Sequence, residues 1–101
     1  MSNFIKAAKT TDVPSGGCLL VQPEGKKVVL FNLGGEFFAL DNSCPHNNGP
    51  ICEGRIEGET VICPYHSWEF DIRTGKAKRV SGYRIKSYSL RLEGDEIFVE
   101  V

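Results

Sequence analysis

Two short segments, Cys44 to His46 and Cys63 to His66, constrain the fold of this chain more than any other feature. Each segment holds one thiol and one imidazole, and together they contain both histidines and two of the four cysteines of the 101-residue sequence. The backbone around them is rich in turn formers, namely Pro45, Asn47, Asn48, Gly49, Pro50 and Pro64. We therefore expect two bent loops that converge on one point.

The ligand chemistry of these loops restricts what the point can hold. Thiolates together with imidazoles suit zinc, copper or iron–sulfur centres, whereas calcium and magnesium require oxygen ligands. A structural zinc site usually pairs Cys with Cys and His with His, but here each loop is mixed. Mixed loops suit two irons, one bound by Cys44 and Cys63 and the other by His46 and His66. A zinc site, or two buried thiols beside two loop histidines without a metal, remain as alternatives.

The two segments resemble the signature of the Rieske family, Cys-x-His followed after a spacer by Cys-x-x-His. The resemblance extends over residues 37–76 and includes the run from Cys63 to Asp71 and the segment Thr74 to Lys76. It implies one [2Fe–2S] cluster held by the four residues Cys44, His46, Cys63 and His66. It also implies a β-sandwich base with a smaller cluster-binding subdomain, placed at about residues 41–75, in which the histidine-bound iron lies at the molecular tip.

Length and composition fit a small carrier. The 101 residues give room for one domain, 1–101, and 41% hydrophobic with 25% charged residues is ordinary for a globular fold. No apolar run approaches the length needed to cross a bilayer, and the N-terminus lacks a signal-peptide core. We expect a cytoplasmic monomer that does not bind membranes. The net charge of −1 gives no basic field for nucleic acid.

The other two cysteines, Cys18 and Cys52, are expected to be small core residues. Respiratory-type members of the family join the two ligand loops by a disulfide, but the corresponding position in the second loop is Tyr65, so that bridge cannot form. A redox-active role for either thiol is the alternative to simple packing.

The rest of the chain predicts short strands joined by tight turns. Gly34-Gly35 and Glu57-Gly58 are the clearest turn signals, and Ile97, Val99 and Val101 alternate with Phe98 and Glu100, which gives the last strand an inward face. The expected strands cover 4–8, 18–22, 27–33, 36–40, 55–56, 60–62, 68–72, 83–92 and 96–101. No long helix and no repeat is expected. The fold class is all-β, an antiparallel sandwich or partly open barrel.

The family's branches differ in features that this sequence lacks. Oxygenase large subunits need further histidines for a mononuclear iron, and respiratory subunits need a membrane anchor. The expected function is that of a free-standing ferredoxin, which passes single electrons from a flavin-containing reductase to a terminal oxygenase such as an aromatic-ring dioxygenase. Such a carrier is not a catalyst by itself. The alternatives are the small subunit of an assimilatory NAD(P)H nitrite reductase, and a zinc-stabilised or metal-free β interaction module.

The neighbours of the second loop bear on the redox potential. High-potential members carry hydroxyl groups two and four residues after the last histidine, where this chain has Trp68 and Phe70. Hydrogen bonds to the cluster sulfurs raise the potential, so we expect a low value, with Ser67 as one nearby hydroxyl. The aromatic residues either exclude water or gate electron transfer.

Two charged stretches are candidates for docking. One is basic and one acidic, and each can equally be a set of solvated loop charges; they comprise Lys76, Lys78 and Arg79, and Glu53, Glu57 and Glu59. The segment 77–83, where many relatives have a proline-bearing third loop, contains no proline.

Overall fold

A computed structural model describes residues 4–42, 51–64, 68–78 and 82–101 of the chain. These residues form ten strands: β1 (Phe4–Lys9), β2 (Cys18–Val21), β3 (Val28–Leu33), β4 (Glu36–Asp41), β5 (Arg55–Glu57), β6 (Thr60–Ile62), β7 (Glu69–Asp71), β8 (Ser87–Tyr88), β9 (Leu90–Glu93) and β10 (Glu96–Glu100). Within the described ranges the helical segments are three short 3-10 turns, η1 (Thr10–Asp12), η2 (Pro23–Gly25) and η3 (Ile51–Glu53).

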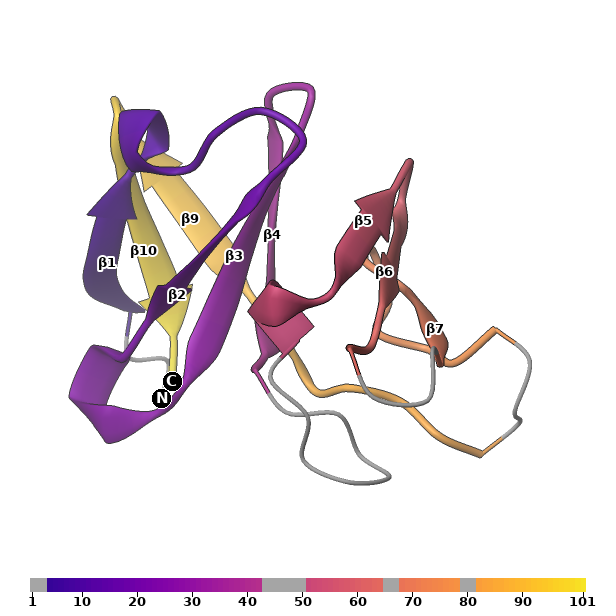
Figure 1. Cartoon of the computed structure of the whole chain (residues 1–101). Coiled ribbons are helices and arrows are strands. Elements are labelled where there is room, and N and C mark those ends of the chain that lie inside the picture. Colours follow the sequence, from indigo (N-terminus) through magenta and orange to yellow (C-terminus); the bar gives the residue numbers. More distant parts are fainter. Residues whose placement is uncertain (1–3, 43–50, 65–67, 79–81) are drawn as a thin grey trace.

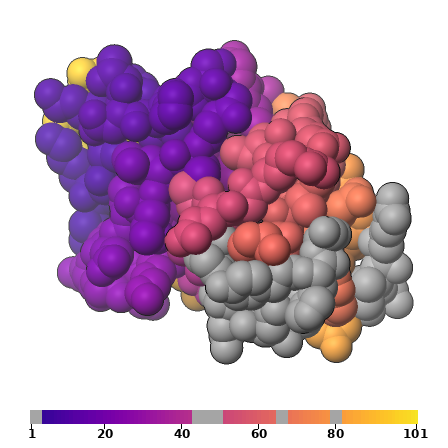
Figure 2. Space-filling model, viewed as in Figure 1, coloured from indigo at the N-terminus to yellow at the C-terminus, as the bar shows by residue number. Residues whose placement is uncertain are grey.

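The strands form three antiparallel sheets. We call β1-β10-β9 the outer sheet, β2-β3-β4-β8 the central sheet, and β5-β6-β7 the small sheet. The central sheet stands between the other two (Figure 1). In the space-filling view, residues 51–64 rest directly against the N-terminal part of the chain (Figure 2). The expected all-β, antiparallel class is confirmed.

Strand β3 is the centre of this arrangement because side chains of a strand alternate between its two faces. Val28 and Leu30 belong to a core shared with the outer sheet, whereas Val29 and Phe31 belong to a core shared with the small sheet. All four are fully buried. A strand covered on both faces is apolar throughout, which explains the unbroken run Val-Val-Leu-Phe in the sequence.

Two further sequence expectations hold in the structure. Gly34 and Gly35 join β3 to β4 with φ angles of 63° and 99°, values that glycine adopts without strain. In β10, Ile97 and Val99 point into the core between the outer and central sheets. The turn between β5 and β6 is shifted by one residue from the prediction, because Glu57 pairs with Thr60 and leaves Gly58 and Glu59 as the turn.

The prediction of one strand over Tyr83–Leu92 is wrong. Ser87 and Tyr88 pair with Leu40 and Ala39 of the central sheet, while β9 pairs with β10 in the outer sheet. The chain thus changes sheets at Ser89, whose carbonyl accepts a hydrogen bond from the Glu100 amide (2.9 Å). Local propensity carries no signal for such a change, since both halves are good strand formers.

Among the described residues, no helix has the length and apolar character needed to span a membrane.

Candidate metal centre

Cys63 is the one candidate ligand whose position the structure describes; Cys44, His46 and His66 lie outside the described residues. It directly follows β6, its side chain is only 1% exposed, and its thiol is free. The sulfur belongs to the core between the central and small sheets. A thiol in this position is shielded from water, as the inner ligand of an iron–sulfur centre should be.

The hairpin of β6 and β7 positions the second ligand segment. Val61 pairs with Phe70 and Ile62 with Glu69, so the two strands run side by side up to the segment. The Cys63 amide then donates to the carbonyl oxygen of Trp68 at 2.8 Å. This bond joins the two ends of the segment that contains His66.

Asn42 joins the two ends of the stretch around the first ligand segment, as the bond between Cys63 and Trp68 does for the second. It follows β4, is only 9% exposed, and accepts at Oδ1 a hydrogen bond from the Cys52 amide (2.8 Å). Its own amide donates to the carbonyl of Lys27 (3.0 Å). The side chain of Asn42 therefore holds together the two ends of the stretch that contains Cys44 and His46.

Gly54 allows the stretch that follows the first ligand segment to lie close to Ile62, which precedes the second. A Cβ atom at this position would lie 2.0 Å from the carbonyl oxygen of Ile62, the residue before Cys63. Only glycine permits such an approach of two backbones. Segment 51–54, which follows the first loop, is consequently packed against the end of the strand that leads into the second loop.

Cys18 and Cys52 are joined by a disulfide, with their Cα atoms 5.9 Å apart. Both are half-buried and pack against the core between the central and small sheets. The expectation that they pack against a core is confirmed, and the disulfide between them is a feature that the sequence did not predict. Their separation of 34 residues leaves no local signal from which the pairing could be predicted.

The donor set fits an iron–sulfur cluster. With Cys18 and Cys52 bonded to each other, the remaining cysteines of the sequence are Cys44 and Cys63, one in each segment. A hollow of about 460 Å³ lies beside Cys63, lined by Glu53, Gly54, Arg55, Ile62, Cys63 and Pro64. Two thiols with two imidazoles match the Rieske ligand set, whereas oxygen-ligated metals would find no matching donors among them.

Comparison with known proteins decides the family. The model of the Rieske [2Fe-2S] domain matches residues 3–89. The chain belongs to this family. The biphenyl dioxygenase ferredoxin subunit of Pseudomonas sp. strain KKS102 is 37% identical over 99 residues, covering 96% of this chain and 91% of that protein. The 3-phenylpropionate/cinnamic acid dioxygenase ferredoxin subunit of Escherichia coli K12 is 37% identical over 101 residues, covering 98% and 94%.

Solved structures agree on the fold of this Rieske chain. The Sphingomonas yanoikuyae B1 ferredoxin superposes with a TM-score of 0.89 at 30% identity, covering 98% of this chain and 99% of that one. A protein described as a nitrite reductase NADPH small subunit superposes with a TM-score of 0.84 at 18% identity, covering 96% and 97%. The latter likeness shows the shared Rieske fold alone.

Three aromatic side chains of the Rieske chain, Trp68, Phe70 and Tyr83, pack together beyond the second ligand segment. Phe70 is fully buried, and the ring of Trp68 packs edge-on against Tyr83, with their centroids 5.0 Å apart. Tyr83 is 44% exposed and forms part of the surface. Phe70 therefore helps to exclude water from the core around Cys63, and its position carries no hydroxyl.

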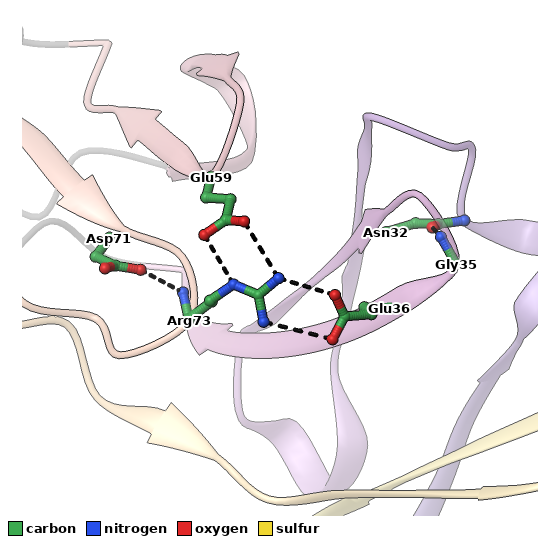
Figure 3. A network of polar contacts seen from close by, with 6 residues as sticks. All are labelled: Asn32, Gly35, Glu36, Glu59, Asp71 and Arg73. Carbon is green, nitrogen blue, oxygen red and sulfur yellow. Dashed lines mark hydrogen bonds and ion pairs between the residues drawn. The ribbon is translucent and has the colours of Figure 1, made fainter.

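Arg73 joins the small sheet to the central sheet (Figure 3). Its guanidinium donates to both carboxylate oxygens of Glu59, at 2.8 and 3.2 Å, and to both of Glu36, at 2.8 and 3.4 Å. It also lies over the ring of Phe38, 5.0 Å from the centroid. The hydrogen bond and charge of Arg73 lower the pKa of Glu36, and bonding to the two carboxylates, Glu36 first, raises the pKa of Arg73.

Burial dominates the electrostatics near the end of β4. It raises the pKa of Asp41, although the positive charge of Lys86 and a backbone hydrogen bond partly offset the effect. Burial, and then the charge of Asp41, also raise the pKa of Tyr88. These groups lie on the central sheet.

Several charges proposed for docking have partners within the chain. Glu57 pairs with Arg55 (2.8 Å), Glu59 pairs with Arg73, and the Lys78 ammonium contacts the hydroxyl of Thr60. Arg79 lies outside the described residues. Two of the three acidic residues, Glu57 and Glu59, thus already have basic partners within the chain.

Sequence reasoning missed three residues that shape this region, Asn42, Gly54 and Arg73. Asn42 carried a weak signal, as a polar residue between a strand and a Cys-containing loop. Gly54 carried none because its contact is with the backbone of Ile62, and Arg73 carried none because its partner Glu36 lies 37 residues away in the central sheet.

Proposed function

We propose that this protein is a single-electron carrier of a multicomponent oxygenase. In this proposal Cys44 and Cys63 bind one iron of a single [2Fe–2S] cluster, and His46 and His66 bind the other. Residues 41–75 form the cluster-binding subdomain. The observation that carries the proposal is the free thiol of Cys63, buried beside the segment that follows the first ligand loop.

The chain's own residues prepare the site for this task. The cluster, when bound, supplies a one-electron couple. Cys63 is held in a dry core by Phe31 and Phe70, and hydrogen bonds from the amides of Cys52 and Cys63 fix the bases of the two loops. A rigid, water-excluded environment reduces the rearrangement that accompanies a change of oxidation state.

The proposed partners are a flavin-containing reductase as donor and a terminal oxygenase as acceptor, each bound transiently by a monomer in the cytoplasm. Nucleic acid and membranes are not proposed as partners. The support is that the curated relatives are named as ferredoxin subunits of dioxygenases and share more than a third of their residues with this chain. The nitrite reductase alternative is supported by the fold alone.

A spectroscopic measurement tests the cofactor. Protein purified without air should be brown and, after reduction with dithionite, should give a rhombic EPR signal with a low average g. A colourless, EPR-silent protein that contains zinc or no metal would overturn the carrier function and favour a β interaction module.

The midpoint potential tests the surroundings of the second loop. We expect a value in the low part of the Rieske range, around −150 mV, because Trp68 and Phe70 offer no hydroxyl to the cluster sulfurs. Potentiometric titration followed by EPR measures it. A midpoint well above zero would contradict this expectation.

A stopped-flow experiment separates the two partner hypotheses. The reduced protein should be oxidised rapidly by the terminal component of an aromatic-ring dioxygenase and slowly by a nitrite reductase flavoprotein. Lys76 and Arg84 line a surface hollow together with Tyr83, and we call these two cations the basic rim. In this proposal the partner contacts the basic rim. Lys76→Glu should therefore slow the oxygenase reaction at low salt, whereas Lys27→Glu, in the loop between β2 and β3, should not. Equal rates for the two variants would exclude docking at the basic rim.

A further inference from the structure

The disulfide between Cys18 and Cys52 uses the two cysteines that the ligand assignment leaves over. Cys18 is the first residue of β2, in the central sheet, and Cys52 lies within η3. The bond therefore links the central sheet covalently to the segment that follows the first ligand loop. It does not join the two ligand loops to each other.

Cys52 is also the residue at which the first ligand loop is closed. Its amide donates to Oδ1 of the buried Asn42, and the sequence between these two residues contains Cys44 and His46. Two residues further on, Gly54 packs against the Ile62 carbonyl. Any constraint on Cys52 is a constraint on the base of the loop.

The same geometry suits the two free thiols. The sulfur of Cys18 lies 3.2 Å from the carbonyl oxygen of Cys52, which would accept a hydrogen bond from the Cys18 thiol after reduction. A disulfide sulfur has no hydrogen to donate, so this bond exists only in the dithiol form. Neither cysteine is fully buried, and reversible oxidation of the pair requires that a small disulfide reach their sulfurs from solvent.

We propose that Cys18 and Cys52 form a reversible thiol–disulfide site whose oxidation braces the first ligand loop and slows the loss of iron. The inference rests on the proposed function, since it concerns the same cluster. Iron leaves after a ligand loop opens locally, and a covalent link at the base of the loop makes that opening rarer. The site thus tunes how long the cluster persists.

The oxidant is a low-molecular-weight disulfide, RSSR. One cysteine thiolate attacks a sulfur of RSSR, forms a mixed disulfide and releases one thiol RSH. The other cysteine thiolate then displaces the second RSH, and the protons of the two cysteines end on the two released thiols. In a reducing compartment the pair stays reduced, and it closes when such disulfides accumulate.

Two matched samples of the cluster-loaded protein test the site. One is treated with oxidised glutathione and the other with a phosphine reductant, both without air, and alkylation with mass spectrometry counts the reactive cysteines. EDTA is then added and the loss of visible absorbance is followed. We expect the oxidised sample to bleach about fivefold more slowly than the reduced one, an effect of the size expected for restricted local opening.

Variants separate the disulfide from side-chain packing. Cys18→Ser, Cys52→Ser and the double variant should all bleach at the rate of the reduced protein under either treatment, without additive effects. Leu20→Ser places a hydroxyl at an exposed position in the same strand and should keep the difference between the two treatments. Additive losses in the double variant would show a packing effect and would overturn the proposal.

Hydrogen exchange distinguishes failure of this inference from failure of the proposed function. The Cys52 amide should exchange more slowly in the oxidised sample, whether or not a cluster is bound, because its bond to Asn42 is held in place. Equal exchange rates, equal bleaching rates, or thiols that glutathione disulfide leaves unpaired would each overturn the inference. A colourless protein that still shows the exchange difference would refute the cluster and leave the thiol–disulfide site standing.

Discussion

The two faces of the central sheet are packed in different ways. Toward the outer sheet the core is purely apolar, built from aliphatic side chains such as Leu30, Ile97 and Val99 on strands of four to six residues. Toward the small sheet the core also contains Cys63, and the strands are only three residues long. Among the described residues the first interface is formed mainly by apolar burial, whereas the second also carries the Cys18–Cys52 disulfide and the ion pairs of Arg73 with Glu36 and Glu59.

This difference indicates that the two cores contribute differently to the molecule, one to its stability and the other to the geometry of the site. The free energy gained by apolar burial does not depend on the direction of particular bonds. The outer and central sheets therefore form a stable sandwich whose apolar side chains can be exchanged for others of similar size. Three-residue strands bury little surface, so we expect the small sheet to rely also on directed contacts and, when it is bound, on the proposed cluster. Directed contacts fix geometry more narrowly than burial does, which suits the part of the molecule that we propose holds the cluster.

The largest expected effect comes from Cys63→Ser. The variant should bind no stable cluster, because one iron would lose a thiolate ligand, while the sandwich of outer and central sheets should stay folded. Iron content, visible absorbance and amide exchange of β3 and β10 measure the two parts separately. Cys52→Ser is the control, since it removes a sulfur in the same region but should still yield brown protein.

Phe31→Ala and Leu30→Ala form a matched pair on the two faces of β3. Each leaves a cavity, and we expect unfolding free energies lower by about 4 and about 3 kcal/mol respectively. Only Phe31→Ala should also speed the loss of iron, because Phe31 shares a core with Cys63 and Leu30 does not. Denaturant titration and bleaching in EDTA give the two readouts. Equal bleaching in both variants would mean that the two cores are not independent.

Gly75→Ala tests the close contact between the backbones of Gly75 and Ile85, near the end of the small sheet. Gly75 has a φ angle of 80°, and a Cβ there would lie 2.1 Å from the Ile85 carbonyl oxygen. The backbone must shift and weaken the bond from the Ile85 amide to Gly75, now 2.7 Å, at a cost of about 3 kcal/mol.

Gly58→Ala is the control for backbone strain alone. Its φ angle is 62°, but a Cβ would meet nothing within 4 Å, so a cost of about 1 kcal/mol is expected. Thermal unfolding of both variants compares the two costs. A similar loss in both would show that the contact with Ile85 is unimportant.

The smallest expected effect is that of Arg73→Gln. Exposed ion pairs stabilise weakly, so we expect a slight loss of stability, with looser contact between the small and central sheets. The pKa of Glu36 is lowered in the folded state, so its contribution is present above its ordinary pKa and is lost as the pH falls through the lowered value.

The stability difference between wild type and Arg73→Gln should therefore be constant near neutral pH and shrink in acid. Denaturant titrations between neutral pH and about pH 3 measure it, since ordinary carboxyl groups titrate near pH 4. Lys6→Gln is a control in the outer sheet, where it removes an ion pair with Glu96. It should leave unchanged the rate at which the protein loses visible absorbance in EDTA. A difference that grows in acid would contradict the assigned role of Glu36.

The sequence predicts most strands of all three sheets to within one or two residues, but not the bonds and contacts between distant parts of the chain. Alternation at Ile97 and Val99 and the paired glycines after Leu33 are local signals, and local signals survive in a single sequence. Three features have no such local signal, because nothing in one partner's sequence indicates the other. They are the switch between sheets at Ser89, the Cys18–Cys52 bond and the approach of Gly54 to Ile62. The ligand set can be predicted from the sequence because metal chemistry demands particular residues at short spacings. For Cys44, His46 and His66 it stays a prediction.

The pairing of Phe4 with Glu100 in the outer sheet has a practical consequence for engineering. Both described ends of the chain emerge beside each other, and the central sheet separates them from β5, β6 and β7 (Figure 1). An affinity tag, a reductase domain or a linker to an electrode could be fused at either end without covering the region around Cys63. The same closeness of the ends makes the chain suitable for circular permutation.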